Sequence, residues 1–421
     1  MNILPEGVSH SRFPALDGYR GIAAFMIVGT HVAFLTAEID QGVVGKIFAR
    51  FDFGVAIFFL LSGFLLYGPF GLAALSGRSR PSSGTFYRRR ILRIFPAYLV
   101  MCVTVLLVAP PMLREAAPTV TQWIANLTLT QTYVPDAQVA SATQTWSLAT
   151  EVSFYAVLPL IAWLATKRSR GNPERSFRRQ LIAMVAVGGL GLTYQILLCF
   201  GFLGSVLLAG FWLPAYLDWF ALGMLVSLIR NAHLMGVNNR ITRIWEATSS
   251  EVGACLVIGL SLFAIAATPL SGPYGLEFNP GFNRLAKHVL FGLSALFLLI
   301  PGFWGRVEGR WLRFMSSPFM RWLGTVSYGV FLWNLFVAGW TMRLLNVHLF
   351  GGWFWVVLPL ATIATYAIGW LSWVLIEKRF IAFSHRGFRP RKEDGQGAAG
   401  VATDHSELPT SVGAGHIGNQ H

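Results

Sequence analysis

Two ionisable side chains, Arg20 and His31, lie inside the first long apolar run, LDGYRGIAAFMIVGTHVAFLT. Ionisable groups inside a membrane span are costly and are usually functional. Eleven residues make about three helical turns, so both side chains would share one helix face at a separation of about 16 Å along the axis. An imidazole can act as a general base near neutral pH, whereas a guanidinium can hold an anion or orient a carbonyl group. The pair predicts a catalytic base with a cationic companion; the alternative is a structural pair bonded to neighbouring helices.

A second candidate is the basic segment FYRRRILRIFP, at the start of the third apolar run, which contains Arg88, Arg89, Arg90 and Arg93. Arg90 and Arg93 are three residues apart and are therefore neighbours on one helix face. Guanidinium groups make bidentate contacts with phosphate, and the helix N-terminus predicted here also favours anions. Two interpretations stay open, namely an anchor that orients the protein in the membrane and a site for phosphate groups.

A third candidate is the segment WSLATEVSFYAVLP, which places Glu151 just inside the fourth apolar run and Tyr155 four residues later on the same face. This carboxylate and phenol could orient His31, which is expected at a similar depth, or the hydroxyl group of an acceptor. The alternative is a glutamate that reaches the membrane surface. Asp218 and Asn334 are further polar residues within apolar runs, and the sequence leaves their roles open.

The elements that must position these residues are membrane-spanning helices. Of 421 residues, 54% are hydrophobic and 12% are charged, against about 25% charged residues in soluble domains. The runs long enough to span a bilayer as helices are 16–36, 51–70, 94–113, 148–166, 181–200, 210–229, 252–270, 285–301, 322–345 and 353–376. The predicted fold class is all-α, a polytopic membrane protein of about ten transmembrane helices.

The distribution of basic residues predicts the orientation of these spans. Of 33 Lys and Arg residues, 26 fall on the side that holds the N-terminus, six fall on the other side, and Arg20 lies within the first span. Because basic residues concentrate on the cytoplasmic side of membrane proteins, both termini are predicted to be cytoplasmic. The same distribution accounts for the net charge of +14 and disfavours a protein that binds nucleic acid.

Three regions are predicted along the chain: a cytoplasmic segment over 1–15, a transmembrane domain over 16–380 and a disordered cytoplasmic tail over 381–421. The tail is rich in glycine and polar residues and lacks an apolar period. No cleavable signal peptide or appended soluble domain is expected. His and Cys residues show no metal-site spacing, so neither a metal nor a permanently bound cofactor is expected.

In these segments the chain resembles the acyltransferase 3 family of integral membrane O-acyltransferases, over about residues 14–380. The resemblance rests on a set of motifs in the family's order: LDGYRGIAAFMIVGTH, FGVAIFFLLSGFLL, FYRRRILRIFPAY, WSLATEVSFYAVLP, LGTVSYGVFLWN and LIEKRF. One position departs from the pattern, because many relatives have a histidine where this chain has Asn334.

The resemblance implies a multi-pass enzyme of the bacterial plasma membrane. Such an enzyme moves an acyl group, acetyl or another short chain, from cytoplasmic acyl-CoA to a hydroxyl of a carbohydrate, glycolipid or secondary metabolite. It implies His31 as catalytic base, Arg20 as its companion, and Arg90 and Arg93 as contacts of the donor phosphates. We expect Arg88 and Arg89 at the same donor site, and Glu151 and Tyr155 at the catalytic site.

Direct transfer and an acyl-histidine intermediate both stay open at this point. The alternative functional class is a proton-coupled transporter or a flippase for a lipid-linked substrate, because intramembrane Arg, His, Glu and Asp can also form a pathway. Transporters are often built from internal repeats, and no clear duplication of the two halves is visible. An acceptor-dependent discharge of acyl-CoA would occur only in an enzyme.

Overall fold

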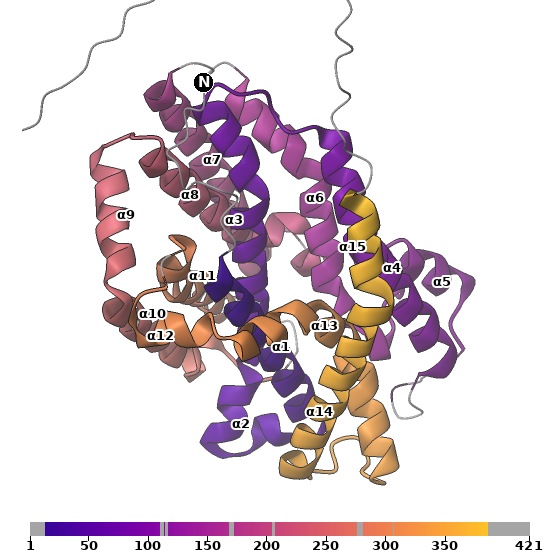
Figure 1. Ribbon diagram of the computed structural model, residues 1–421. Coiled ribbons are helices and arrows are strands. Elements are labelled where there is room, and N and C mark those ends of the chain that lie inside the picture. Colours follow the sequence, from indigo (N-terminus) through magenta and orange to yellow (C-terminus); the bar gives the residue numbers. More distant parts are fainter. Residues whose placement is uncertain are drawn as a thin grey trace, which may run out of the picture. The chain divides into compact units, whose positions relative to one another are not determined.

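The computed structural model describes residues 13–109, 113, 117–167, 172–203, 207–275, 281–305 and 307–385. These residues form helices and connecting loops, and the described ranges contain no strand. The long helices are α1 (Pro14–Leu35), α3 (Gly54–Leu75), α4 (Ser83–Val108), α6 (Thr145–Thr166), α7 (Pro173–Cys199), α8 (Leu217–Leu234), α11 (Phe282–Phe303), α13 (Pro318–Leu344) and α14 (Phe354–Ser372). The all-α prediction is confirmed (Figure 1).

Shorter elements connect the long helices. The α-helices among them are α2 (Gly42–Ala49), α5 (Val120–Leu127), α9 (Arg240–Ser250), α10 (Val252–Ala266), α12 (Gly309–Met315) and α15 (Lys378–His385). The single-turn or slightly longer 3-10 segments are η1 (Glu38–Asp40), η2 (Phe51–Phe53), η4 (Ala140–Ala142), η5 (Leu207–Phe211), η6 (Leu213–Tyr216) and η7 (Pro269–Ser271). A π-helical turn, η8 (Trp373–Glu377), joins α14 to α15.

Nine helices in the described ranges are long and apolar enough to cross a membrane, and a tenth span exists if the bent pair α9 and α10 counts as one. These two helices meet at an angle of 87°. Because α10 has 15 residues, it is about 22 Å long, which is shorter than a bilayer core. Nine of the ten predicted spans therefore correspond to long helices, whereas the predicted span 252–270 is a short helix after a sharp bend.

Two helices extend beyond the ranges predicted from the sequence. The third span was expected from residue 94, but α4 begins at Ser83 because Ser82 caps it by accepting a hydrogen bond from the Thr85 amide. The basic segment therefore lies in the second and third turns of the helix, away from its N-terminus. The chain is also helical through residue 385, within the range predicted to be disordered; residues 386–421 lie outside the described residues. The predicted orientation of the termini stays a prediction.

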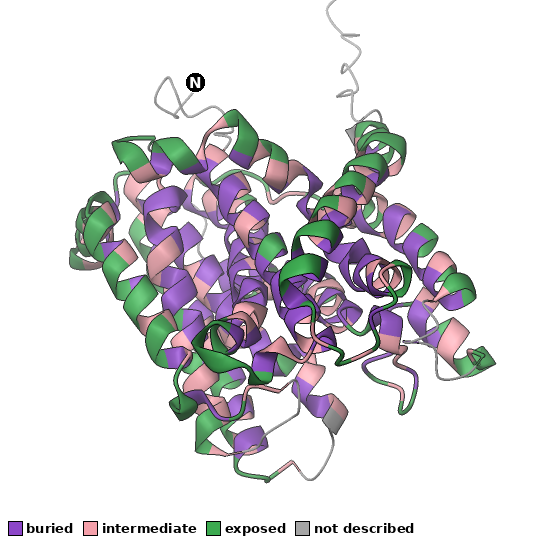
Figure 2. Ribbon diagram, turned by 90° about the horizontal axis from the view of Figure 1, so that it is seen from below, coloured by how far each residue is buried: buried purple, intermediate pink, exposed green. Residues whose placement is uncertain are grey.

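One of the most extensive helix contacts in the fold packs α1 against α13, which lie far apart in the sequence. Small residues allow this close crossing: a Cβ added to Gly324 would lie 2.1 Å from the carbonyl oxygen of Asp17. Glycine at such a crossing lets helix backbones approach closely in membranes. Figure 2 shows that buried residues face the inside of the helix bundle while exposed residues follow its outer surface.

Arg50, the residue that follows α2, is a charged residue buried inside the fold. Arg50 is 1% exposed and donates hydrogen bonds to the carbonyl oxygens of Ala266, Gly272 and Pro273, at 3.2, 2.5 and 3.0 Å. Its guanidinium also lies over the Tyr274 ring. Because these contacts reach the last residue of α10 and the segment that follows it, this one side chain ties the end of α10 to the end of α2.

Candidate active site

A cavity of about 280 Å³ lies among the long helices α1, α3, α4, α6 and α13. Its walls combine apolar side chains, among them Phe58 and Phe331, with a polar set. The polar lining consists of Arg20, Ser62, Arg90, Arg93, Ser147, Glu151, Tyr155, Ser327 and Tyr328. The cavity therefore gathers residues from three of the segments that the sequence singled out.

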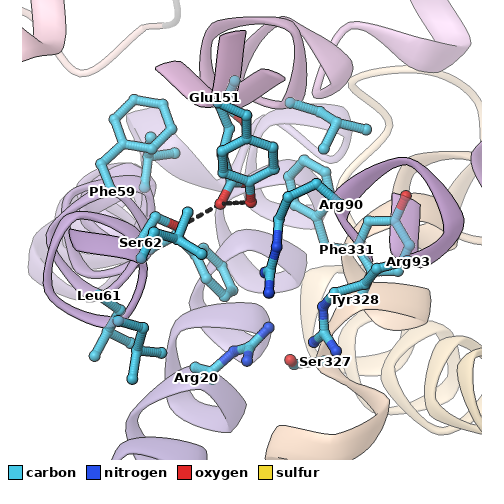
Figure 3. Close-up of a pocket in the computed structure, with 17 residues that line it drawn as sticks. Arg20, Phe59, Leu61, Ser62, Arg90, Arg93, Glu151, Ser327, Tyr328 and Phe331 are labelled. Carbon is cyan, nitrogen blue, oxygen red and sulfur yellow. Dashed lines mark hydrogen bonds between the residues drawn. The ribbon is translucent and has the colours of Figure 1, made fainter. Parts of the chain in front are cut away.

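Three guanidinium groups converge in this cavity (Figure 3). Arg20 comes from α1, while Arg90 and Arg93 come from the same face of α4. No described side chain hydrogen-bonds Arg20 or Arg93, and the buried Nε of Arg90 has no partner in the described part of the chain. Because Glu151 is the one carboxylate in the lining, the cavity carries an excess of two positive charges. Such a site favours an anionic ligand.

Glu151 is held by two hydroxyl groups (Figure 3). Ser62 of α3 donates to its Oε1, and Tyr155 donates to the same oxygen at 2.6 Å. The second bond follows from the four-residue spacing predicted on α6. The carboxylate also interacts electrostatically with Arg20 and Arg90. Glu151 and Tyr155 therefore belong to the arginine cavity, and Ser62 is a member of the site that sequence reasoning missed.

His31 lies on the same helix as Arg20 but outside this cavity. It is absent from the cavity lining, although it follows Arg20 by three turns of α1. Its Nδ1 lies 2.6 Å from Oδ1 of Asn334 on α13. Ser62 and Tyr155 donate to Glu151, and no hydrogen bond between described residues joins Glu151 to His31; the role of Glu151 or Tyr155 in orienting His31 or the acceptor stays a prediction. Asn334, whose role the sequence left open, is the polar partner of His31.

The aromatic residues Phe58 and Phe331 connect these two places. Both line the cavity, and their rings make an edge contact with centroids 6.3 Å apart. The carbonyl oxygen of Phe331 accepts a hydrogen bond from Asn334, one helical turn further along α13. Along the contact between α1 and α13, Arg20 therefore lines the cavity, whereas His31 bonds to Asn334 one turn beyond Phe331.

The four arginines of the basic segment separate into two pairs. Arg90 and Arg93 line the cavity, whereas Arg88 and Arg89 are exposed. The guanidinium of Arg88 lies 5.5 Å from the centroid of the Phe383 ring. The geometry thus brings half of the predicted donor site together with Arg20.

A second carboxylate interacts with the arginines but does not line the cavity. Glu377 is 2% exposed, accepts a hydrogen bond from Ser372 at 3.3 Å, and interacts electrostatically with Arg93 and Arg20. It ends the π-helical turn η8, a rare conformation that is frequent at functional sites. The motif LIEKRF contains this residue, but no local pattern in the sequence predicts that it lies near α1 and α4.

Asp218 belongs to a separate cluster. Its Oδ2 lies 2.7 Å from Nε2 of His288 on α11. The other ring nitrogen, Nδ1, lies 3.0 Å from Nε2 of Gln195 on α7, and the ring stacks on Trp219. The partner of Asp218 is therefore His288, and Asp218 is absent from the cavity lining.

Comparison with known proteins identifies the chain. The profile of a family described as an acyltransferase domain matches residues 13–374. The chain belongs to the acyltransferase 3 family. Its described residues include nine helices long and apolar enough to cross a membrane, and all five helices that line the cavity lie within the matched range.

Individual relatives match shorter stretches of this acyltransferase. "Acyltransferase MdmB" of Streptomyces mycarofaciens is 32% identical over 157 residues, which are 35% of this chain and 39% of the relative. An uncharacterized protein of Haemophilus influenzae is 34% identical over 125 residues, covering 27% of this chain and 50% of the relative. The aligned stretches span half or less of these relatives. No solved structure matches the chain.

Proposed function

We propose that this acyltransferase moves a short acyl group, such as acetyl, from cytoplasmic acyl-CoA to a hydroxyl group of a carbohydrate, glycolipid or secondary metabolite. The observation that carries the proposal is the convergence of Arg20, Arg90 and Arg93 on one cavity whose lining holds a single carboxylate. The phosphate groups of coenzyme A supply the negative charge that this cavity lacks. Arginine suits them because its planar guanidinium binds phosphate through two parallel hydrogen bonds.

The chemistry takes place at His31. The acyl-pantetheine arm extends from the arginine cavity along the contact between α1 and α13, past Phe331, and presents its thioester to the imidazole. His31 removes the hydroxyl proton of the acceptor as that oxygen attacks the thioester carbonyl carbon. The C–S bond then breaks, and the thiolate of coenzyme A takes up the proton from the imidazolium. Proton transfer by a positioned side chain contributes about 10²–10⁴-fold to a rate.

The remaining cavity residues hold the cations in place. Glu151 balances part of the charge of Arg20 and Arg90, and its hydrogen bonds from Ser62 and Tyr155 fix its own position. Glu377, which lies outside the cavity lining, balances part of the charge of Arg93 and Arg20. Since like charges repel at short distance, these carboxylates keep three guanidinium groups close enough to act on one ligand.

The donor site is tested by the double variant Arg90→Ala/Arg93→Ala. Each lost charged hydrogen bond costs about 1.5–3 kcal/mol, so the KM for acetyl-CoA should rise by at least about 10-fold. The assay measures transfer of radiolabelled acetyl from acetyl-CoA to the membrane fraction of the host. The matched control is Arg240→Ala/Arg243→Ala, which removes two exposed arginines with the same spacing on α9 and should leave the KM within twofold.

Two results would contradict this assignment. An unchanged KM for acetyl-CoA in the α4 variant would remove the phosphate site from the cavity. Accumulation of an untransformed substrate across vesicle membranes, without release of coenzyme A, would instead favour the transporter class. The variant Arg88→Ala/Arg89→Ala in the same series measures whether the exposed pair also contacts the donor, as the sequence predicts.

A further inference from the structure

The bond between His31 and Asn334 lies inside the fold rather than at its surface. Asn334 is fully buried, with 0% exposure, and its Oδ1 lies 2.6 Å from Nδ1 of His31. Its Nδ2 donates a hydrogen bond of 2.6 Å to the carbonyl oxygen of Phe331 in the preceding turn of α13. The amide therefore has two partners on opposite sides, and both contacts are short.

These two partners fix the direction of the amide. A backbone carbonyl oxygen can only accept, so the side of Asn334 that faces Phe331 must be the NH₂ group. A rotation of the amide by 180° would place two oxygens against each other and lose that bond. Oδ1 is consequently the atom that faces His31, and because it too can only accept, Nδ1 of His31 must carry the hydrogen.

The protonation of Nδ1 decides the chemistry of the other nitrogen. In a neutral imidazole one nitrogen is a donor and the other is an acceptor, so Nε2 carries the lone pair. No described residue hydrogen-bonds Nε2, and His31 keeps part of its surface accessible. The charged group that interacts electrostatically with His31 is Asp52, whose Oδ2 is paired with Lys287 at 2.5 Å. The free lone pair of His31 therefore lies at Nε2.

We infer that Asn334 is a positioning residue, which holds His31 in the tautomer and ring orientation that offer the Nε2 lone pair to the acceptor hydroxyl. This inference rests on the proposed function of His31 as the base. In the transfer step the acceptor O–H proton moves to Nε2 as the C–O bond forms, and Nε2 returns the proton to the departing thiolate as the C–S bond breaks. The Nδ1–H bond to Asn334 persists throughout, because the amide neither gives up nor takes up a proton.

A neutral amide also suits a base that must release its proton in every cycle. A carboxylate at position 334 would accept the same hydrogen bond but would stabilise the imidazolium by its charge. The ring would then remain protonated to a higher pH. Asparagine accepts the same hydrogen bond without a negative charge, so it does not stabilise the imidazolium as a carboxylate would.

The experiment compares Asn334→Leu, Asn334→Asp and His31→Ala in the full-length protein in membrane vesicles, with radiolabelled acetyl-CoA as donor and the host membrane fraction as acceptor. Asn334→Leu keeps the volume and removes the acceptor oxygen; we expect kcat to fall about 10²-fold with the KM for acetyl-CoA within twofold. Asn334→Asp should retain most of kcat at high pH, with the half-maximal rate displaced to higher pH. Thr341→Val, which removes another side-chain hydrogen bond on α13, is the control and should match the wild type.

Each outcome decides between distinct conclusions. Wild-type kcat in Asn334→Leu, while His31→Ala is inactive, overturns the inference and leaves the proposed function intact. Wild-type activity in His31→Ala overturns the proposed role of His31 as the base, and with it the premise of this inference, while acyl transfer by the protein would stand. If the leucine variant is not monodisperse in detergent, the aspartate variant decides alone, since an unchanged pH profile or a complete loss of kcat in a folded protein contradicts a positioning role.

Discussion

His31 and His288 are both histidines inside membrane-spanning helices, yet their hydrogen bonds differ. His288 is 5% exposed, and both of its ring nitrogens are held, Nε2 by Asp218 and Nδ1 by Gln195. Its ring also stacks on Trp219, with centroids 4.4 Å apart. His31 has one nitrogen held by Asn334 and keeps accessible surface.

This difference separates a structural histidine from a candidate base. With Gln195 donating to Nδ1 and Asp218 accepting from Nε2, His288 has no lone pair left for a substrate. Its bonds instead join α7, α8 and α11. For a histidine inside a span, the number of ring nitrogens left without a hydrogen bond is thus a better indication of catalysis than the presence of the residue alone.

The largest effect is expected for His31→Ala. Loss of the base should reduce transfer of acetyl from acetyl-CoA by about 10²–10⁴-fold, while the thermal unfolding midpoint in detergent stays within a few degrees of the wild type. Fluorescence-detected unfolding and the radiolabel assay on the same preparation measure both quantities. Substantial turnover in this variant would erase the distinction between the two histidines.

A different loss is expected for His288→Ala. Removing this ring leaves the buried Asp218 carboxylate and the Gln195 amide without their partner, at a cost of about 3 kcal/mol in the free energy of unfolding. The unfolding midpoint should fall by several degrees, whereas kcat per folded molecule should remain within about threefold. A loss of kcat as large as that of His31→Ala, in protein that is still folded, would assign chemistry to the second cluster.

The smallest effect is expected around Glu151. Tyr155→Phe removes one of the two hydrogen bonds to the carboxylate at a cost of about 1 kcal/mol, which corresponds to about fivefold in kcat/KM. Because Ser62 still donates to the same oxygen, the double variant Ser62→Ala/Tyr155→Phe should lose more than the product of the two single effects. Simple multiplicativity would indicate that the two hydroxyl groups act independently.

The sequence predicted most of the scaffold and part of the site. Apolar runs of about 20 residues identify spanning helices because the bilayer requires that length. The spacings Arg90 to Arg93 and Glu151 to Tyr155 are local properties of one helix, and the structure places each pair on one face. Local periodicity therefore accounts for the members of the arginine cavity that share a helix.

Contacts between helices were beyond the reach of the sequence. The pairing of His31 with Asn334 depends on where α1 crosses α13, and that crossing depends on Gly324 and Asp17. The position of Glu377 depends on a π-helical turn that no local sequence pattern predicts. The segment before residue 94 was excluded from the third span because arginines lower its average apolarity, although Ser82 starts the helix earlier.

The tight crossing at Gly324 has a consequence for how this enzyme could change over evolutionary time. Since one helix, α1, carries both Arg20 and His31, any sliding or tilting of it against its neighbour displaces the two functional groups together. A bulkier residue at position 324 would therefore shift the side chains of Arg20 and His31 by the same motion.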